Sequence, residues 1–131
     1  MGLPGSGKTY LAERIAPLLD AAWYNADKVR AMANDWDFSN LGRKRQAARM
    51  KTFADFEVAQ GRTVICDFVC PTARTRILFD ANVTIWMDTI QQSRFADTNE
   101  LFEKPENVDF CVKTWNNHNH TMIAGQLKQT Y

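Results

Sequence analysis

The sequence predicts an α/β fold in which a mostly parallel sheet lies between two layers of helices. Along the 131 residues, short apolar runs alternate with helical stretches, which is typical of repeated β-α-β units. The pattern Gly-x4-Gly-Lys-Thr spans residues 2–9, and this pattern usually joins a buried strand to a helix. Because no repeat, low-complexity tract or Pro/Gly-rich linker divides the chain, we expect one domain over residues 1–131.

The composition limits the kinds of molecule and membrane that this chain is expected to bind. The chain is 45% hydrophobic and 24% charged, with a formal net charge of +1. No apolar run approaches the ~20 residues that a membrane-spanning helix needs, so we expect a cytoplasmic protein without a membrane partner. The small net charge gives no general attraction for nucleic acid. The three cysteines do not form a disulfide framework, and we interpret them as reduced thiols.

The first half of the chain predicts helices around a short strand. Apolar residues recur on one face over residues 8–19, which predicts a helix that Pro17 kinks or ends. Residues 21–25 are expected to form a buried strand, and Asp27 to cap a short helix that ends near residue 32. The longest helix is expected over residues 43–60. Gly61 would stop this helix, and its apolar stripe would be Met50, Phe53, Ala54 and Val58.

The second half predicts three more strands. Residues 63–66 form a continuous apolar run that Asp67 closes, and Pro71 suits the first turn of a short helix. Further strands are expected at residues 83–87 and 108–112, with a terminal helix over residues 119–129. The polar, irregular stretch between them, residues 90–107, is interpreted as a lid.

The glycine pattern predicts a phosphate-binding loop. Its glycines allow successive backbone N–H groups to point inward as an anion site, and the following helix adds the positive end of its dipole. Lys8 can reach the β- and γ-phosphates of a nucleotide, and the Thr9 hydroxyl can ligate magnesium. We therefore predict ATP and Mg²⁺ as cofactors. The predicted nucleotide-binding residues are Gly2, Pro4, Gly5, Ser6, Gly7, Lys8, Thr9 and Tyr10.

The segment before this loop departs from the usual pattern. Only Met1 precedes Gly2, so the strand that normally leads into the loop and lies centrally in the sheet is missing from this chain. Without it, two neighbouring strands would have unpaired backbone edges, which is unfavourable. Two explanations remain open. The chain is an N-terminally truncated version of a longer protein, which we favour, or another segment fills the gap, as one from a second copy would in a homodimer.

Two residues are candidates for an acceptor site from their position. Asp27 follows a predicted strand and faces the expected cleft, so its carboxylate could orient or deprotonate an acceptor hydroxyl. Arg30 lies one helical turn later and could pair with an anionic group of the acceptor. The alternatives are a helix N-cap for Asp27 and a solvated surface arginine for Arg30.

Several segments together resemble the adenylylsulfate kinases, which phosphorylate the ribose 3′-hydroxyl of adenosine 5′-phosphosulfate. The phosphate loop is similar to theirs, and residues 25–30 (Asn-Ala-Asp-Lys-Val-Arg) resemble their Asp-Gly-Asp-Asn-Val-Arg. Residues 68–71 (Phe-Val-Cys-Pro) resemble their Phe-Ile-Ser-Pro, and residues 102–109 their Tyr-Glu-x-Pro-Glu-Asn-Pro-Asp stretch. A further similarity is the helix entry formed by Phe38, Ser39, Arg43, Gln46 and Arg49. The resemblance implies a three-layer P-loop nucleoside-triphosphate hydrolase-like fold, here without its first strand.

The resemblance implies further site residues. Arg43 would grip the phosphosulfate, and Phe38 would pack on the acceptor adenine, with a core phenylalanine as the alternative. By the same resemblance, Gln46, Val69 and Cys70 are assigned to the acceptor site. Thr114 and Trp115 follow the last expected strand, where such kinases commonly contact the donor adenine.

Three departures from the family leave the acceptor open. Asp67 follows an apolar strand as a Walker-B aspartate does, so we predict that it holds magnesium with Thr9, yet the family usually has a hydroxyl residue there. Cys70 replaces the family's serine. The lid is shorter and lacks a Lys…Gly-Phe-Thr-Gly pattern. In it we assign Arg94 to neutralising the transferring phosphate and Phe95 to stacking on a base.

The sequence therefore predicts an ATP-dependent phosphotransferase with small-molecule nucleotide substrates and Lys8, Asp27 and Arg94 as catalytic residues. The expected reaction moves the γ-phosphate to a hydroxyl of a nucleotide-like acceptor, with adenosine 5′-phosphosulfate favoured. Two alternatives remain. One is a polynucleotide or other small-molecule hydroxyl kinase, suggested by the departures and by the basic residues between positions 43 and 51. The other is a nucleotide-binding remnant without catalysis, suggested by the missing strand.

Overall fold

The computed structural model describes residues 1–116 and 118–130. Within them, helices and short strands alternate as the sequence predicts. In chain order the elements are α1 (Lys8–Leu18), β1 (Ala22–Asn25), α2 (Ala26–Ala33), α3 (Asn40–Ala59), β2 (Val64–Asp67), α4 (Ala73–Phe79), β3 (Ile85–Met87), α5 (Ala96–Leu101), β4 (Phe110–Val112) and α6 (Asn119–Thr130).

The strands form two parallel pairs. β1 pairs with β2, and this register places Asn25 opposite Asp67 at the carboxyl ends of the two strands. β3 pairs with β4, with Met87 opposite Val112. Each pair is a separate two-stranded sheet among the described residues, and no strand joins β2 to β3. The parallel strands and the covering helices confirm the predicted α/β class.

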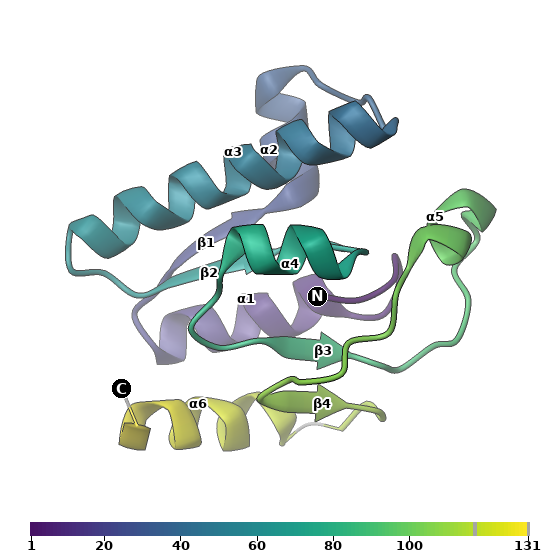
Figure 1. Ribbon diagram of the computed structural model, residues 1–131. Coiled ribbons are helices and arrows are strands. Elements are labelled where there is room, and N and C mark those ends of the chain that lie inside the picture. The colour runs from purple at the N-terminus through teal and green to yellow at the C-terminus, as the bar shows by residue number, and fades with distance from the viewer. Residues whose placement is uncertain (117, 131) are drawn as a thin grey trace.

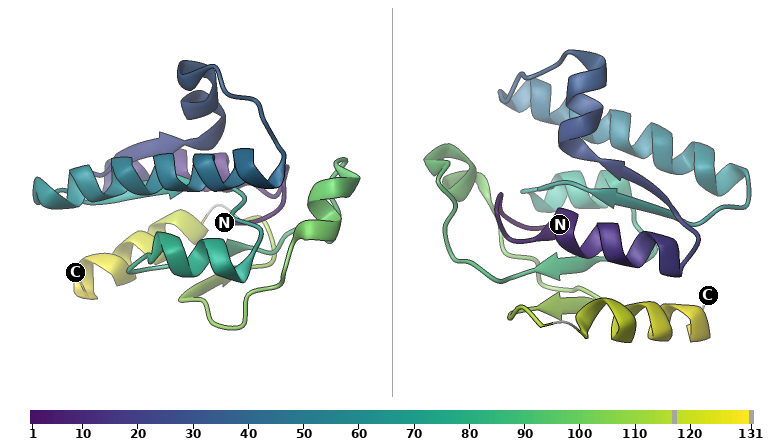
Figure 2. Two further views of the ribbon diagram at one scale, coloured as in Figure 1. Left: turned by 45° about the horizontal axis from the view of Figure 1, so that its top comes forward. Right: turned by 180° about the vertical axis from the view of Figure 1, so that it is seen from behind.

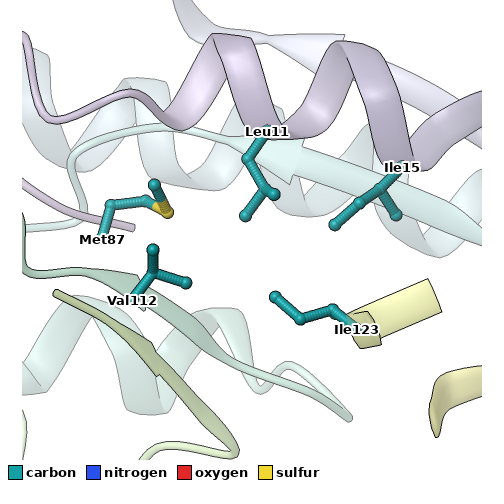
Figure 3. Close-up of a cluster of buried hydrophobic side chains, with 5 residues drawn as sticks. All are labelled: Leu11, Ile15, Met87, Val112 and Ile123. Atoms are coloured by element: carbon teal, nitrogen blue, oxygen red, sulfur yellow. The ribbon is translucent and has the colours of Figure 1, made fainter. Parts of the chain in front are cut away.

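Helices cover both faces of these strands. Figure 1 shows α3 and α4 on the near face, and the view from behind in Figure 2 shows α1 and α6 on the far face. One buried apolar cluster lies between α1, α6 and the β3–β4 pair, and its five side chains point toward one another in Figure 3. A second cluster lies between α2, α3 and the loop after β2, with Met50 fully buried at its centre. The core therefore has one half on each side of the strands.

Two helix starts differ from the predictions. α3 begins at Asn40 rather than at residue 43, because the Ser39 hydroxyl accepts a hydrogen bond from the Gly42 backbone N–H at 3.2 Å and caps the helix. α2 is capped by Asn25 and not by Asp27. The Asn25 side-chain oxygen accepts from the Lys28 N–H at 3.0 Å, which leaves Asp27 within the first turn. The expected lid also contains a short helix, α5.

The predicted apolar stripe of α3 is wrong at one position. Val58 is 56% exposed, whereas the neighbouring Glu57 is buried. Glu57 accepts a hydrogen bond from the Tyr24 hydroxyl at 3.1 Å and pairs with Arg62 at 3.0 Å. These partners satisfy the buried carboxylate. Val58, on the other side of this helix turn, faces a cavity beside the strands.

Met1 lies between the two strand pairs, where Figure 1 places the N-terminus. Its amino group donates to the Ile85 carbonyl at 2.7 Å, and its carbonyl accepts from the Met87 N–H at 2.9 Å. This pair of bonds is one rung of a parallel ladder with β3. On the other side, the Gly2 N–H donates to the Val69 carbonyl at 3.4 Å. Met1 and Gly2 together thus connect β3 to the loop after β2 through backbone hydrogen bonds.

The buried amino group of Met1 predicts a pH dependence of stability. Burial, with a smaller effect from Lys8, lowers its pKa from 8.0 to about 5; Cys70 and Asp67 act in the opposite direction, and Arg76 adds slightly to the lowering. Between about pH 5 and 8 the unfolded chain therefore binds more protons than the folded chain at this group, so the free energy of unfolding should rise with pH. Urea denaturation across this range measures the slope. The matched control is the same chain with an acetylated amino group, which should lose this contribution; equal slopes for the two would contradict it.

Candidate functional site

The phosphate loop is a turn held open by glycines. Gly5 and Gly7 have φ values of 83° and 103°, a backbone conformation that residues with a side chain rarely adopt. α1 begins directly after Gly7, so the first backbone N–H groups of this helix lie at the loop. Trp115, from the segment after β4, lies against Gly7. A Cβ atom on Gly7 would be 1.9 Å from the ring carbon Cη2 of that tryptophan.

The lysine of the loop is half-buried at the start of α1. Its Nζ donates to the Leu3 carbonyl at 3.0 Å, across the loop. Burial lowers the pKa of Lys8, and the charges of Asp67 and Asp27 oppose that shift. The lysine is therefore placed inside the loop with two carboxylates near enough to act on its charge.

Three side chains meet beside the loop. The Thr9 hydroxyl donates to Oδ2 of Asp67 at 3.0 Å, and the Asn25 amide donates to the same oxygen at 2.9 Å. The Asn25 amide also lies 3.1 Å from the Thr9 hydroxyl oxygen. The structure thus brings together the two predicted magnesium ligands, Thr9 and Asp67. It adds Asn25, which sequence reasoning missed and whose only signal is a polar residue at the end of a strand.

The donor groups at this place fit a nucleotide with magnesium. Mg²⁺ binds through oxygen, keeps several waters and uses one or two carboxylates together with substrate phosphates, and Thr9 and Asp67 supply that kind of donor. The Ser6 hydroxyl is fully buried in the loop without a hydrogen-bond partner. Such an orphaned hydroxyl fits a site that offers donors to an oxyanion. No group of three or more His, Cys, Asp or Glu side chains forms a metal cluster in the part of the chain that the structure describes.

Tyr10 lies on the outer side of the loop. Its ring meets the Trp115 ring edge-on, with centroids 4.9 Å apart, and the Arg14 guanidinium lies 3.3 Å above it. The structure therefore places the predicted residues Tyr10 and Trp115 in contact at the mouth of the phosphate loop. Together they form a half-exposed aromatic surface next to Gly7.

The predicted acceptor residues of α2 and α3 also come together. Phe38 is 49% exposed, and two guanidinium groups lie near its ring, that of Arg30 at 4.3 Å and that of Arg43 at 5.6 Å from the ring centroid. Arg30 is buried, and its Nη1 donates to the Asp35 and Asp37 carbonyls at 2.9 and 3.2 Å. The expected alternative of a solvated surface arginine is therefore wrong for Arg30. Burial lowers its pKa.

Arg43 links α3 to the lid. Its Nε donates to the Phe38 carbonyl at 2.9 Å, and its Nη2 donates to the Thr98 hydroxyl at 3.1 Å. The same nitrogen lies 3.5 Å from the Asp97 carboxylate of α5. Arg43 thus connects the start of α3 to α5 in the segment expected to be a lid.

Gln46 is buried and held by hydrogen bonds, whereas Asp27 is exposed. Gln46 is buried, its amide nitrogen donates to the Ala26 carbonyl at 3.1 Å, and its oxygen accepts from Arg49 at 2.7 Å. It therefore fixes α3 against the start of α2. Asp27 is exposed on the first turn of α2, and its charge acts on both Lys8 and Arg30.

The loop after β2 is fixed by an arginine that sequence reasoning missed. Arg76 of α4 donates to the Cys70, Pro71 and Glu103 carbonyls at 2.9, 3.2 and 2.6 Å. It thereby joins two segments that are far apart in the sequence, residues 68–71 and residues 102–109. Cys70 is buried with a φ of 49°, and burial raises the pKa of its thiol to about 11. The Val69 carbonyl accepts from Gly2.

The lid residues lie apart from the loop. Arg94 is exposed, with its guanidinium 5.0 Å from the ring centre of Phe95. Among the described residues, no hydrogen bond or ion pair connects it to the phosphate loop. Asn99 closes the turn that carries both residues by bonding to the Ser93 backbone and hydroxyl. The structure thus keeps Arg94 and Phe95 adjacent but does not bring them to Lys8.

A phosphate loop followed directly by α1, with Thr9 of that helix bonded to the aspartate that ends the parallel strand β2, defines the class of protein. The chain has the fold of a P-loop kinase. No model of a protein family matches the chain. None of the helices that the structure describes is long and apolar enough to cross a membrane.

Comparison with known proteins gives the particular resemblance. A probable adenylyl-sulfate kinase of Aeropyrum pernix is 36% identical over an alignment of 84 residues, and the match covers 57% of this chain and 44% of that protein. The match therefore spans less than half the length of this curated relative. The crystal structure of APE1195 superposes with a TM-score of 0.84 at 24% identity, over 98% of this chain and 92% of that one.

A structure of the Mycobacterium tuberculosis APS kinase CysC, in complex with AMPPNP and APS, gives a TM-score of 0.77. It is 20% identical and covers 98% of this chain and 92% of that chain. At these identities, both below 25%, the two solved structures show that the chain shares their fold and show nothing more. Together with the curated relative they confirm the resemblance to adenylylsulfate kinases that the sequence predicts.

Proposed function

We propose that this chain is an ATP-dependent kinase that phosphorylates a hydroxyl group of a nucleotide-like acceptor, with adenosine 5′-phosphosulfate as the favoured substrate. The observation that carries the proposal is the meeting of Lys8, Thr9 and Asp67 at the phosphate loop. The half-exposed Phe38 ring beside two arginines supports the acceptor half of the proposal. A planar base can stack on an aromatic ring, and guanidinium groups suit the anionic part of such a molecule.

Each residue has a role in this proposal. The loop N–H groups and Lys8 hold the β- and γ-phosphates of ATP, and Thr9 and Asp67 hold Mg²⁺. When bound, the metal neutralises charge on the phosphate oxygens. Asp27 orients the acceptor hydroxyl and accepts its proton as the new phosphoester bond forms and ADP leaves. Arg43 and Phe38 hold the acceptor, Gln46, Val69 and Cys70 shape its pocket, and the lid brings Arg94 and Phe95 toward it.

A coupled assay of ADP release tests this function. ATP and Mg²⁺ are held constant, and adenosine 5′-phosphosulfate, gluconate as a sugar-acid hydroxyl acceptor and a single-stranded oligonucleotide are added in separate reactions. Release that depends on adenosine 5′-phosphosulfate and yields a product phosphorylated at the ribose 3′-hydroxyl supports the proposal. Tight ATP binding without acceptor-dependent release would contradict it and favour a nucleotide-binding protein without catalysis.

Replacing Arg43 by alanine should weaken acceptor binding specifically. Hydrogen bonds to charged groups contribute about 1.5–3 kcal/mol, so the KM for adenosine 5′-phosphosulfate should rise at least about tenfold while the KM for ATP stays unchanged. Lys44→Ala is the matched control, because Lys44 is exposed on the next position of α3. Steady-state kinetics with each substrate varied in turn give both constants. Equal increases for both substrates would contradict the assignment of Arg43 to the acceptor.

The structure does not favour a nucleic-acid substrate. The basic run of α3 is largely neutralised by the chain itself. Arg45 pairs with Asp35 at 2.6 Å, Arg49 pairs with Asp35 at 2.9 Å, and Lys51 pairs with Asp55 at 3.3 Å. Paired charges release few counterions on binding a phosphate backbone, so we expect oligonucleotide binding to be weak and nearly independent of salt.

A further inference from the structure

The segment that follows β3 lies against the phosphate loop. A Cβ atom on Gly5 would be 3.9 Å from Cδ1 of Ile90, so the Ile90 side chain lies beside the turn of the loop. The preceding residue, Thr89, donates a hydrogen bond from its hydroxyl to the Ser6 carbonyl at 2.6 Å. The segment therefore contacts the loop through one apolar side chain and through one hydroxyl group.

The sheet fixes the position of Thr89. β3 (Ile85–Met87) ends two residues earlier, and the Asp88 N–H donates to the Val112 carbonyl of β4 at 2.8 Å. The backbone is thus still bonded to the sheet immediately before it passes the phosphate loop. Thr89 consequently presents its hydroxyl to the loop from a position that the strands define.

The Ser6 carbonyl relies on this hydroxyl for its hydrogen bond. Ser6 is fully buried, so water does not reach its carbonyl oxygen. Within residues 1–116 and 118–130, Thr89 is the donor that the structure shows for this oxygen. A buried carbonyl without a donor is unfavourable, so the Thr89 hydroxyl holds the Ser6 carbonyl in its direction.

The direction of this carbonyl determines the direction of the next N–H group. The peptide bond between Ser6 and Gly7 is trans, and in a trans peptide unit the C=O and N–H groups point to opposite sides. Because the carbonyl points to Thr89, the Gly7 N–H points away from the segment after β3. It has no acceptor among the described residues, so it is available to an oxyanion.

Glycine alone does not fix this orientation. The peptide unit can turn over by changing the ψ of Ser6 and the φ of Gly7, which is 103° in this structure. Glycine adopts positive and negative φ about equally well, so Gly7 presents little steric resistance to the turn. A reversed unit would present a carbonyl oxygen in place of an N–H group, and an anion site requires N–H groups.

We propose that Thr89 is a positioning residue for the phosphate loop. Its hydroxyl holds the peptide unit of Ser6 and Gly7 in the orientation in which the Gly7 N–H donates to a phosphate oxygen of ATP. Thr89 acts through this peptide unit and does not itself touch the nucleotide. The inference rests on the proposed function, and it adds to the ATP site a residue that lies far from the glycine pattern in the sequence.

Replacing Thr89 by valine tests the proposal, because valine keeps the shape of threonine and lacks the donor. Loss of one neutral hydrogen bond should raise the Kd for ATP with Mg²⁺ about five- to tenfold, which calorimetric titration measures. Thr89→Ser keeps the hydroxyl and should bind ATP within about twofold of the original chain.

Thr52→Val is the matched control. The Thr52 hydroxyl also donates to a backbone carbonyl, that of Ala48 at 2.9 Å, but it lies on the exposed side of α3. This substitution removes the same kind of bond away from the loop, so the Kd for ATP should stay within about twofold of the original.

The amide signal of Gly7 separates positioning from a general loss of stability. In ¹H–¹⁵N spectra at saturating ATP, this signal should shift in the original chain and in Thr89→Ser. The shift should be much smaller in Thr89→Val, because its N–H group no longer donates to the phosphate. A merely structural role would lower the Tm of Thr89→Val and leave the Gly7 shift at saturation as it is in the original chain.

The outcomes are distinct. Equal ATP affinity and an equal Gly7 shift in Thr89→Val and the original chain overturn the inference, and so does a Thr89→Ser variant that binds as weakly as Thr89→Val. If Thr89→Val does not fold, Thr89→Ala replaces it, and failure of both to fold also overturns the inference. An original chain that binds no ATP would overturn the proposed function and this inference with it. ATP binding without phosphoryl transfer would overturn the proposed function alone, since the binding measurements do not use kinase activity.

Discussion

Replacing Gly7 by alanine is expected to abolish ATP binding and to lower the free energy of unfolding by about 1–3 kcal/mol. Two causes act together. The φ of Gly7 is 103°, which strains any residue with a side chain, and the new Cβ would lie 1.9 Å from Cη2 of Trp115. Either the loop or the tryptophan must move, and the N–H groups then no longer converge on a phosphate. Calorimetric titration with ATP and chemical denaturation measure the two effects.

Gly125→Ala is the matched control for this substitution. Gly125 lies in the interior of α6, and nothing lies within 4 Å of a Cβ built on it. Alanine there should stabilise the chain by about 0.5–1 kcal/mol without changing ATP affinity. The double variant Gly7→Ala with Trp115→Ala removes the collision but keeps the backbone strain, so it should recover only part of the lost stability. Normal ATP affinity in Gly7→Ala would contradict the geometry of the loop.

Replacing Lys8 by methionine is expected to reduce phosphoryl transfer at least a hundredfold, on the scale seen when one group that stabilises a transition-state charge is removed. The lysine Nζ already lies inside the loop, 3.0 Å from the Leu3 carbonyl. Methionine fills a similar volume without the charge, so the loop should stay folded while charge on the β- and γ-phosphates is no longer neutralised. The coupled assay of ADP release measures the loss.

The matched control for Lys8→Met is Lys28→Met, because Lys28 is exposed on α2. This substitution removes the same charge from the chain without touching the loop, so turnover should stay within about twofold of the original. Circular dichroism and the Tm of Lys8→Met show whether its fold is intact. A folded Lys8→Met variant with normal turnover would contradict the proposed role of the phosphate loop.

The sequence predicts most elements of the fold because local patterns determine them. The glycine loop, the helix after it and the strand runs depend on spacing within a few residues, and α1, β1 and β3 lie where these patterns indicate. The patterns could not predict which side of α3 is covered. Val58 has the spacing of a core residue, yet it is 56% exposed and lines the cavity beside the strands, because burial depends on which elements the fold packs against that face.

The residues of the candidate site also differ in whether the sequence can point to them. Lys8, Thr9 and Asp67 could be assigned because their neighbours in sequence carry the signal. Arg76 could not, because its importance comes from three carbonyls that folding brings to it, one of them 27 residues away at Glu103. The sequence predicts Asp27 as the cap of α2, but Asn25 caps this helix, because β1 ends at Asn25 and α2 begins at Ala26.

Asn25 and Asp67 stand at the two ends of one rung of the β1–β2 ladder, and both reach the Thr9 hydroxyl. A carboxylate at either end of the rung would therefore present its oxygens to nearly the same point in space. Moving the acid from one strand to the other keeps the charge beside Thr9 and changes only which strand carries it. Descendants of one ancestor can then differ at both columns of an alignment while keeping the same local chemistry. A comparison that scores each column alone would count two changed residues, although only one carboxylate has moved from one strand to the other.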